Sequence, residues 1–199
     1  MLSYKTFISE KYTRNIIVVD VQPMYQNYHN KKFKTWEFCE FLNKSRDILY
    51  FYNGVNTVGS DTEEDVKNFL IENEIDENKL NDIKFYDKGY GFFRGYMDQG
   101  ISENIIIKMI RIMFQKKVID SRDIESDEWE ILLGVDFEEV RDLIESEESF
   151  YIPDIDIATL KQFNGGYIVG GGKNECLKEV QLLMSAFNIK AKIVSKFVY

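Results

Sequence analysis

Three residues of this chain have the types and the placement that covalent catalysis requires, namely Asp20, Lys88 and Cys176. Asp20 ends one apolar run, Lys88 follows another, and Cys176 stands where a helix should begin, after a turn of three glycines. Backbone N–H groups at a helix start stabilise a thiolate and can hold a developing oxyanion. The cysteine is therefore a candidate nucleophile, with the aspartate as a general base or metal carboxylate. The lysine is a candidate to pair with both or to hold an anionic substrate.

Each of the three also has an ordinary structural interpretation. Asp20 could instead stabilise a turn or cap a helix. Lys88 could instead be a solvated lysine in a loop. Cys176 has the alternative of a buried cysteine on the sheet-facing side of its helix. The negative charges of Glu175 and Glu179 oppose formation of a thiolate there, whereas Lys173 favours it.

Residues near these three are candidates for binding a substrate. Gly171 and Gly172 allow close approach of a substrate to the backbone. The stretch 89–93 alternates glycines with bulky aromatics, which suits the wall of a pocket or a corner of the core. The substrate-binding candidates are Gln22, Tyr25, Asn53, Tyr90, Phe93, Gly171, Gly172 and Lys173.

The elements that must position these residues alternate between strands and helices. Apolar, β-branched runs predict strands at 15–21, 47–52, 82–86, 166–170 and 189–198. Helical spacing of apolar residues predicts helices at 35–44, from 60 onward, at 102–115 and at 173–187. Ser60 or Asp61 is the expected cap of the second helix.

This alternation predicts an α/β fold, with one Rossmann-like three-layer domain spanning residues 1–199. Its central sheet should be mostly parallel, with helices on both faces. The unbroken apolar character of 15–21 predicts a central strand that is buried on both sides. Asp20 and Cys176 should then meet at the carboxyl edge of the sheet, where open α/β sheets bind ligands.

Residues 115–164 fit this alternation poorly. They are acidic and predict short helices, with Asp136 and Glu139 as a cap pair. We expect an insertion or a covering layer within the single domain.

Composition excludes several classes of protein. The net charge is −9, from 25 Lys and Arg against 34 Asp and Glu, which argues against a nucleic-acid or anionic-membrane surface. One histidine, His29 in a polar stretch, cannot supply a multi-histidine metal site. Two cysteines make no disulfide framework, and neither a secretory leader nor a membrane-spanning run is visible. We expect a cytoplasmic protein with reduced thiols.

The motifs around Asp20, Lys88 and Cys176, and their order along the chain, resemble those of the isochorismatase-like cysteine hydrolases, the superfamily that includes nicotinamidases. The matching features are Asp20-Val21-Gln22 after the first strand, Lys88 before an aromatic loop, and Cys176-Leu177 after a strand and a small-residue turn. The resemblance covers residues 15–100 and 165–199. The chain is also similar to uncharacterised proteins of phage genomes, which implies no assigned reaction.

The resemblance implies a role for each residue. Asp20 would take the thiol proton, Lys88 would hold the pair, and Cys176 would attack a carbonyl or imine carbon. Backbone amides near Cys176 and Gly172 would form the oxyanion hole. Many nicotinamidases bind a metal near the second strand, but this chain has no histidine there. We therefore expect a hydrolase of a small amide, imide or related substrate that uses no metal and no cofactor.

Other functions stay open at this level. The same fold without activity would be a binding protein, and a homo-oligomer is compatible with the sequence. A Mg²⁺-dependent nuclease would need acidic residues gathered at strand ends, for which the candidates are Asp20, Asp87, Asp120, Asp123 and Glu175. The turn 170–173 could hold an anionic group, although its spacing is not that of a phosphate-binding loop.

Overall fold

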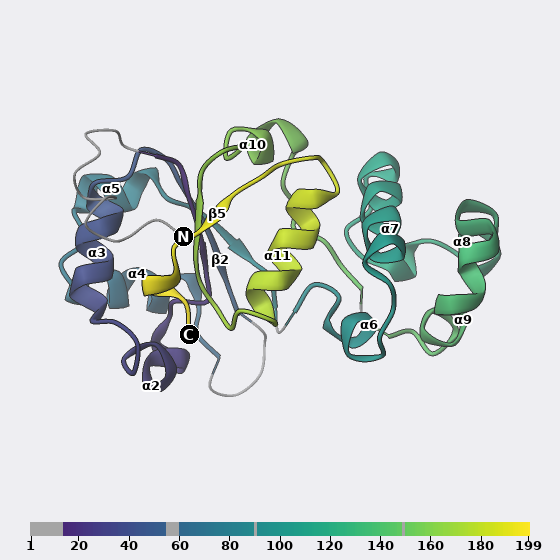
Figure 1. Cartoon of the computed structure of the whole chain (residues 1–199), viewed down its shortest axis with the longest axis horizontal. Helices are drawn as coiled ribbons and strands as arrows, with labels where there is room; N and C mark the ends of the chain where they lie inside the picture. The colour runs from purple at the N-terminus through teal and green to yellow at the C-terminus, as the bar shows by residue number, and fades with distance from the viewer. Residues whose placement is uncertain (1–13, 55–59, 90, 149) are drawn as a thin grey trace.

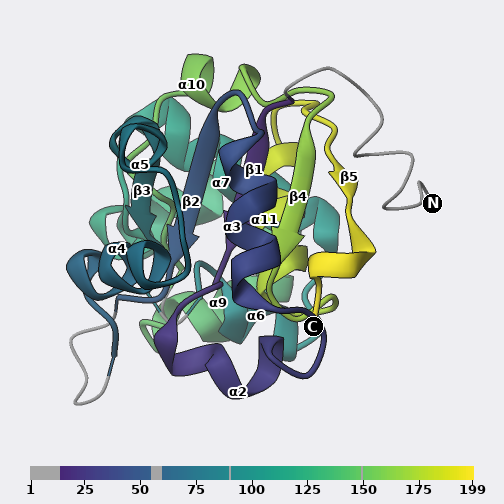
Figure 2. The same ribbon diagram turned by 90° about the vertical axis from the view of Figure 1, so that its left-hand side faces the viewer.

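A five-stranded parallel sheet forms the centre of the molecule. The computed structural model describes residues 14–54, 60–89, 91–148 and 150–199. The strand order is β3-β2-β1-β4-β5, and helices cover both faces (Figures 1 and 2). The strands are β1 (Ile16–Val19), β2 (Ile48–Tyr52), β3 (Lys84–Asp87), β4 (Tyr167–Gly170) and β5 (Lys192–Ile193). Every pairing is parallel, which confirms the expected α/β, Rossmann-like class.

The central strand β1 separates two hydrophobic cores. All four of its residues are fully buried, because β2 and β4 flank it and helices cover both faces. Side chains alternate across a strand, so Ile17 and Val19 enter one core while Ile16 and Val18 enter the other. The apolar run of the sequence has no polar face because neither face meets water.

Two groups of helices cover the sheet. One face carries α3 (Thr35–Asn43), α4 (Glu63–Glu72) and α5 (Glu77–Asp82), and the other carries α7 (Glu103–Lys116) and α11 (Cys176–Ser185) (Figure 1). The short helices are α2 (Gln26–His29) and α6 (Arg94–Asp98) near the carboxyl edge, and α10 (Ile157–Lys161) near the opposite edge. No helix in the described ranges has the length and apolar character to cross a membrane.

Residues 115–164 add an outer layer on the α7 side. Helices α8 (Ser126–Leu133) and α9 (Phe137–Glu145) lie beyond α7 in Figure 1. Trp129 is fully buried there, and its indole N–H donates to the Ser121 carbonyl at 3.0 Å. Nζ of Lys108 on α7 donates to the Leu133 carbonyl at 2.7 Å and to Asp136 at 2.6 Å. This layer therefore extends the core on that face.

Two capping predictions were wrong. Thr62, rather than Ser60 or Asp61, caps α4, and its side chain and that of Asp65 form a reciprocal capping box. The Asp136 side chain makes no capping bond at α9 because it pairs with Lys108. The carboxylate of Glu139 instead accepts the Ser102 N–H at 2.8 Å.

The last predicted strand, 189–198, is much shorter in the structure. Only Lys192 and Ile193 pair with β4, and a 3-10 turn, Ser195–Phe197, follows. The turn places Phe197 among the aromatic rings of Phe33, Phe38 and Phe41. Burial of this ring favours the turn over further pairing at a sheet edge, and the turn carries Tyr199 back to β1.

The predicted strand 82–86 starts too early. Asp82 ends α5, a helix that the sequence analysis missed, and β3 begins at Lys84. Asp76 caps α5 by accepting backbone N–H bonds from Asn78 and Lys79. Asp76 is a favourable capping residue, so this local signal was present in the sequence.

Candidate active site

Asp20, Lys88 and Cys176 meet at the carboxyl edge of the sheet. Asp20 directly follows β1, Lys88 directly follows β3, and Cys176 is the first residue of α11. Nζ of Lys88 lies 3.1 Å from Oδ2 of Asp20, and both side chains are fully buried. The thiol of Cys176 interacts with the same carboxylate. The structure therefore brings together the three residues that the sequence singled out.

The reach of Lys88 follows from the strand order. Strand β2 lies between β3 and β1, so the side chain must cross about 10 Å of sheet to reach Asp20. The extended lysine side chain covers part of this distance, and the Asp20 side chain covers the rest. Its backbone is held at both ends, since its N–H donates to the Tyr52 carbonyl at 2.8 Å and its carbonyl accepts from the Tyr151 hydroxyl.

The backbone at Asp20 is left-handed, with a φ of 55°. This region is uncommon for residues other than glycine, and such outliers persist where surrounding contacts enforce them. The Asp20 N–H donates to the Phe51 carbonyl at 2.9 Å, and the Asp20 carbonyl accepts from the Tyr199 hydroxyl at 2.8 Å. These bonds aim the carboxylate toward Lys88 and Cys176.

The glycine turn after β4 presents Cys176. Gly170 and Gly171 have positive φ values of 80° and 59°, and a Cβ on Gly170 would lie 2.1 Å from the Val19 carbonyl oxygen. The Gly172 carbonyl accepts the N–H groups of Glu175 at 3.1 Å and Leu177 at 3.3 Å. Those two N–H groups are engaged in the turn. No carbonyl among the described residues accepts the Cys176 N–H, which is therefore the candidate oxyanion donor.

Burial and mutual charge set the ionisation of the three groups. Burial raises the pKa of Asp20 above its ordinary value, and the ammonium of Lys88 opposes that effect. Burial alone would lower the pKa of Lys88, but the charges of Asp20, Cys176 and Glu179 and the hydrogen bond to Asp20 together outweigh it, so the pKa is raised. Burial and the Asp20 charge together raise the pKa of Cys176 to about 12. At neutral pH the resting site therefore holds a charged lysine and a protonated thiol.

A second carboxylate, predicted only as a negative neighbour of Cys176, completes the buried cluster. Glu179 lies one helical turn after Cys176 on α11 and is fully buried. Its Oε1 accepts the Phe93 N–H at 3.2 Å, and it interacts electrostatically with Lys88. Its position three residues after the cysteine was a visible signal, but only the structure shows its burial.

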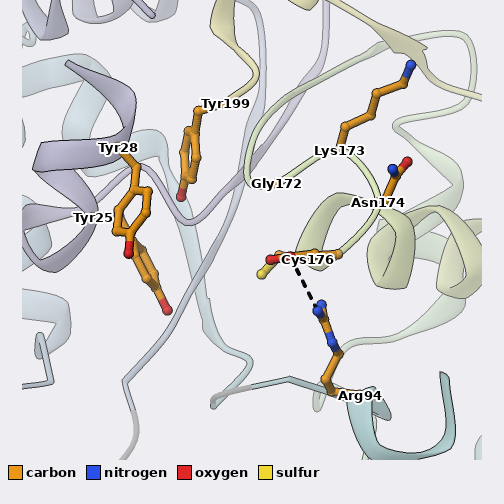
Figure 3. Close-up of a pocket in the computed structure, with 9 residues that line it drawn as sticks. Tyr25, Tyr28, Arg94, Gly172, Lys173, Asn174, Cys176 and Tyr199 are labelled. Atoms are coloured by element: carbon orange, nitrogen blue, oxygen red, sulfur yellow. Dashed lines mark ion pairs between the residues drawn. The ribbon is translucent and has the colours of Figure 1, made fainter. Parts of the chain in front are cut away.

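A cavity of about 570 Å³ opens beside Cys176. Figure 3 shows Tyr25, Tyr28 and Tyr199 on one side, facing Cys176 and Arg94 on the other. The Tyr28 and Tyr199 rings are stacked with their centroids 6.3 Å apart. This volume lies in the range of small-molecule sites. The cavity is lined by Tyr25, Tyr28, Arg94, Gly172, Lys173, Asn174, Glu175, Cys176 and Tyr199.

The substrate-binding predictions divide into two groups. Tyr25, Gly172 and Lys173 line the cavity, although the Lys173 side chain points away from Cys176 in Figure 3. Gln22, Asn53, Phe93 and Gly171 are not among the lining residues and have structural contacts instead. Tyr90 lies outside the described residues.

Gln22 and Asn53 tie the loop after β1 to the loop after β2. The Gln22 amide donates to the Asn53 carbonyl at 3.0 Å and to Asp61 at 2.8 Å, and it accepts the Asn53 N–H at 2.8 Å. The Asn53 amide donates to the Tyr25 hydroxyl at 2.7 Å. Both residues therefore support the aromatic wall indirectly. Phe93 is fully buried, and the Gly171 carbonyl accepts the Tyr199 N–H at 3.2 Å.

Two residues of the cavity carried little signal in the sequence. Arg94 on α6 pairs with Asp98 at 3.0 Å and with Glu175 at 3.6 Å, and Figure 3 marks the second pair. Tyr199 reaches the site only through the turn after β5.

His29, which was expected in a polar loop, is fully buried and stacks on Phe33.

The acidic residues considered for a metal site have separate partners. Asp87 accepts the N–H groups of Gly54 and Gly89, and Asp120 pairs with Arg122. Within the described ranges, no three His, Cys, Asp or Glu side chains gather in a way that could hold a metal ion.

Comparison of the chain with protein-family models, curated proteins and solved structures gave no match.

Proposed function

We propose that this protein is a cysteine hydrolase of a small amide, imide or related substrate, of the isochorismatase-like type that its motifs resemble. The observation that carries the proposal is the buried Asp20–Lys88 pair in contact with Cys176 at the floor of a cavity. Buried groups with shifted pKa values in a cavity are typical of active sites.

The first step of the proposed reaction forms a thioester. The sulfur of Cys176 attacks the carbonyl carbon as Asp20 takes the thiol proton, because the protonated thiol is a weak nucleophile at neutral pH. Burial makes Asp20 a stronger base than an exposed aspartate. Lys88 keeps its charge and balances the developing negative charge, and the Cys176 N–H donates to the oxyanion. Asp20 then returns the proton to the leaving nitrogen as the C–N bond breaks.

The second step releases the acid. Water attacks the thioester while Asp20 takes one of its protons, and Asp20 then gives that proton to the departing sulfur as the carbon–sulfur bond breaks, which restores the thiol. One water is consumed, and the products are an amine and a carboxylic acid. The cavity leaves room for the substrate between Cys176 and the tyrosines.

The experiment that tests the proposal measures the pH dependence of Cys176 alkylation by iodoacetamide in a Cys39→Ser background. Cys39 is buried and is removed so that only one thiol reacts. Asp20→Asn deletes a negative charge and is expected to lower the apparent pKa of Cys176. Lys88→Met deletes a positive charge at similar length and is expected to raise it. A coupled site gives shifts in opposite directions.

Turnover is the companion measurement. A panel of small amides and imides is screened for amine release, with Cys176→Ser and Asp20→Asn expected to reduce the rate by about 10²-fold or more. Asp20→Asn should thus make the thiol more reactive and the enzyme less active. A thiol whose alkylation profile is indifferent to both partners would overturn the proposal.

A second candidate function is binding without catalysis, and one observation favours it. The outer layer exposes Ile131 at 81% and Val135 at 92% of their surfaces, which is unusual for apolar residues so close in sequence. A contact between two copies of this chain would cover them. Light scattering tests this: Ile131→Asp with Val135→Asp should dissociate such a dimer, and a monomer before mutation argues against it.

A further inference from the structure

Glu179 is a buried carboxylate for which the proposed chemistry has no use. Its Oε2 has no hydrogen-bond partner among the described residues, while Oε1 accepts the Phe93 N–H at 3.2 Å. The chain approaches it closely at Gly91, where an added Cβ would lie 2.8 Å from Oε1. An unpaired buried oxygen is costly, so a role at the adjacent site would explain why it is there.

The charged groups around Glu179 come from four elements. Asp20 follows β1, Lys88 follows β3, and Arg94 lies on α6. Cys176 lies one turn earlier on the same helix as Glu179. Among the charges that act on the thiol, Lys88 alone favours the thiolate, whereas Asp20 and Glu179 disfavour it. The buried ammonium of Lys88 therefore interacts with two buried carboxylates, those of Asp20 and Glu179.

We propose that Glu179 is a positioning residue that competes with the Cys176 thiolate for the charge of Lys88 and so keeps the thiol protonated in the resting protein. The inference rests on the proposed function. Its physical basis is that like charges in a poorly solvated site repel strongly, so a thiolate beside two carboxylates needs more positive charge than one lysine supplies. Burial and the charge of Asp20 raise the pKa of Cys176 to about 12, and the charge of Glu179 acts in the same direction.

The consequence is that Cys176 has low reactivity until substrate is bound. A thiol held in its protonated form resists oxidation and unspecific alkylation, because both proceed through the thiolate. Cys176 then reacts with a substrate only when Asp20 takes the thiol proton during the attack of the sulfur. Glu179 touches no reacting atom in this scheme and acts through Lys88 and Cys176.

Glu179→Gln tests the inference because the amide keeps an oxygen for the Phe93 N–H and removes the charge. We expect the apparent pKa of Cys176 alkylation to fall, with about tenfold more thiolate at neutral pH for each unit of the fall. The pH profile is the readout, since a thiolate of lower pKa is also intrinsically less nucleophilic. Glu103→Gln is the matched control, because it removes an exposed carboxylate bound to Lys178 at 2.6 Å, next to Glu179 in the chain.

An unchanged or raised apparent pKa in Glu179→Gln overturns the inference, as does an equal fall in Glu103→Gln. If Glu179→Gln does not fold, Glu179→Met removes the charge with an apolar chain of similar length and carries the same expectation. Failure of this inference is distinguishable from failure of the proposed function. In the first case the pKa still responds to Asp20→Asn and Lys88→Met, and in the second case it responds to neither.

Discussion

The hydroxyl of Tyr199 donates a hydrogen bond of 2.8 Å to the backbone carbonyl of Asp20, a residue 179 positions earlier in the chain. The Tyr199 N–H also donates to the Gly171 carbonyl at 3.2 Å. One residue thus joins the loop that carries the candidate base to the turn that presents the candidate nucleophile. Both of its partners have left-handed backbones, with φ values of 55° and 59°.

Tyr199→Phe should weaken this connection while keeping the ring in the cavity wall. We expect the free energy of unfolding to fall by about 1 kcal/mol, the usual net contribution of one hydrogen bond. The apparent pKa of Cys176 should then depend less strongly on Asp20, because that carboxylate is no longer held in place. Urea unfolding and the alkylation pH profile measure the two effects.

Tyr28→Phe is the control for that variant. Tyr28 stacks on Tyr199 in the same wall but is 60% exposed. Its loss of a hydroxyl should leave the free energy of unfolding unchanged within about 0.5 kcal/mol. Equal effects of the two variants on stability and on the pH profile would show that Tyr199 does not position Asp20.

Gly170→Ala should destabilise the fold far more than Gly100→Ala. Both glycines have a φ of 80°, so both substitutions carry the same left-handed strain of about 1–2 kcal/mol. A Cβ on Gly170 would also lie 2.1 Å from the Val19 carbonyl oxygen, whereas nothing lies within 4 Å of one on Gly100. We expect an additional loss of about 1–3 kcal/mol at Gly170, from the forced separation of β1 and β4.

Urea unfolding of the two alanine variants gives this difference directly. Because Gly170 pairs with Val19, next to Asp20, and begins the turn that leads to Cys176, its substitution should also change the alkylation profile of the thiol. Similar stabilities for the two variants would mean that β1 and β4 are not packed as closely as the structure describes.

The stability of the protein should depend on pH through Glu179. Burial raises the pKa of Glu179 above its ordinary value of 4.5, so between that pH and the folded pKa the folded state holds a proton that the unfolded state has lost. Stability from this group is therefore lost as the pH rises through the folded pKa. Because glutamine does not titrate, the stability of Glu179→Gln relative to wild type should rise with pH from about 4.5 up to the folded pKa of Glu179 and stay constant above it.

The measurement is urea unfolding of wild type, Glu179→Gln and Glu103→Gln across that range. The gain of Glu179→Gln is about 1.4 kcal/mol for each unit by which the folded and unfolded pKa values differ. Glu103→Gln is the control for the loss of one exposed carboxylate. A difference between wild type and Glu179→Gln that stays constant with pH would contradict the raised pKa.

Much of the scaffold was predictable because it depends on local patterns. The apolar run of β1 required burial on both faces, and the glycines after β4 required a turn before a helix. In a parallel sheet the carboxyl ends of all strands share one edge. Asp20, Lys88 and Cys176 each follow a strand, so their convergence could be predicted from position in the chain.

The errors come from contacts between distant segments. Thr62 caps α4 in a capping box with Asp65, whereas the Asp61 carboxylate accepts hydrogen bonds from Gln22 and Met24 instead. The segment 189–198 has the composition of a strand, but most of it leaves the sheet to bury Phe197. Strand composition reports a preference for pleated, half-buried surfaces, and packing decides how much of the segment is paired.

The sequence by itself determined the order of the elements and the end of the sheet at which Asp20, Lys88 and Cys176 lie, because hydrophobic periodicity and chain breaks are local properties. Only the tertiary structure decided that Glu179 is buried beside Lys88 and that Tyr199 is bonded to Asp20. Those contacts depend on which helix face meets which strand end and on how distant segments pack. The same packing excludes water from the charges, and this exclusion sets the pKa of the Cys176 thiol.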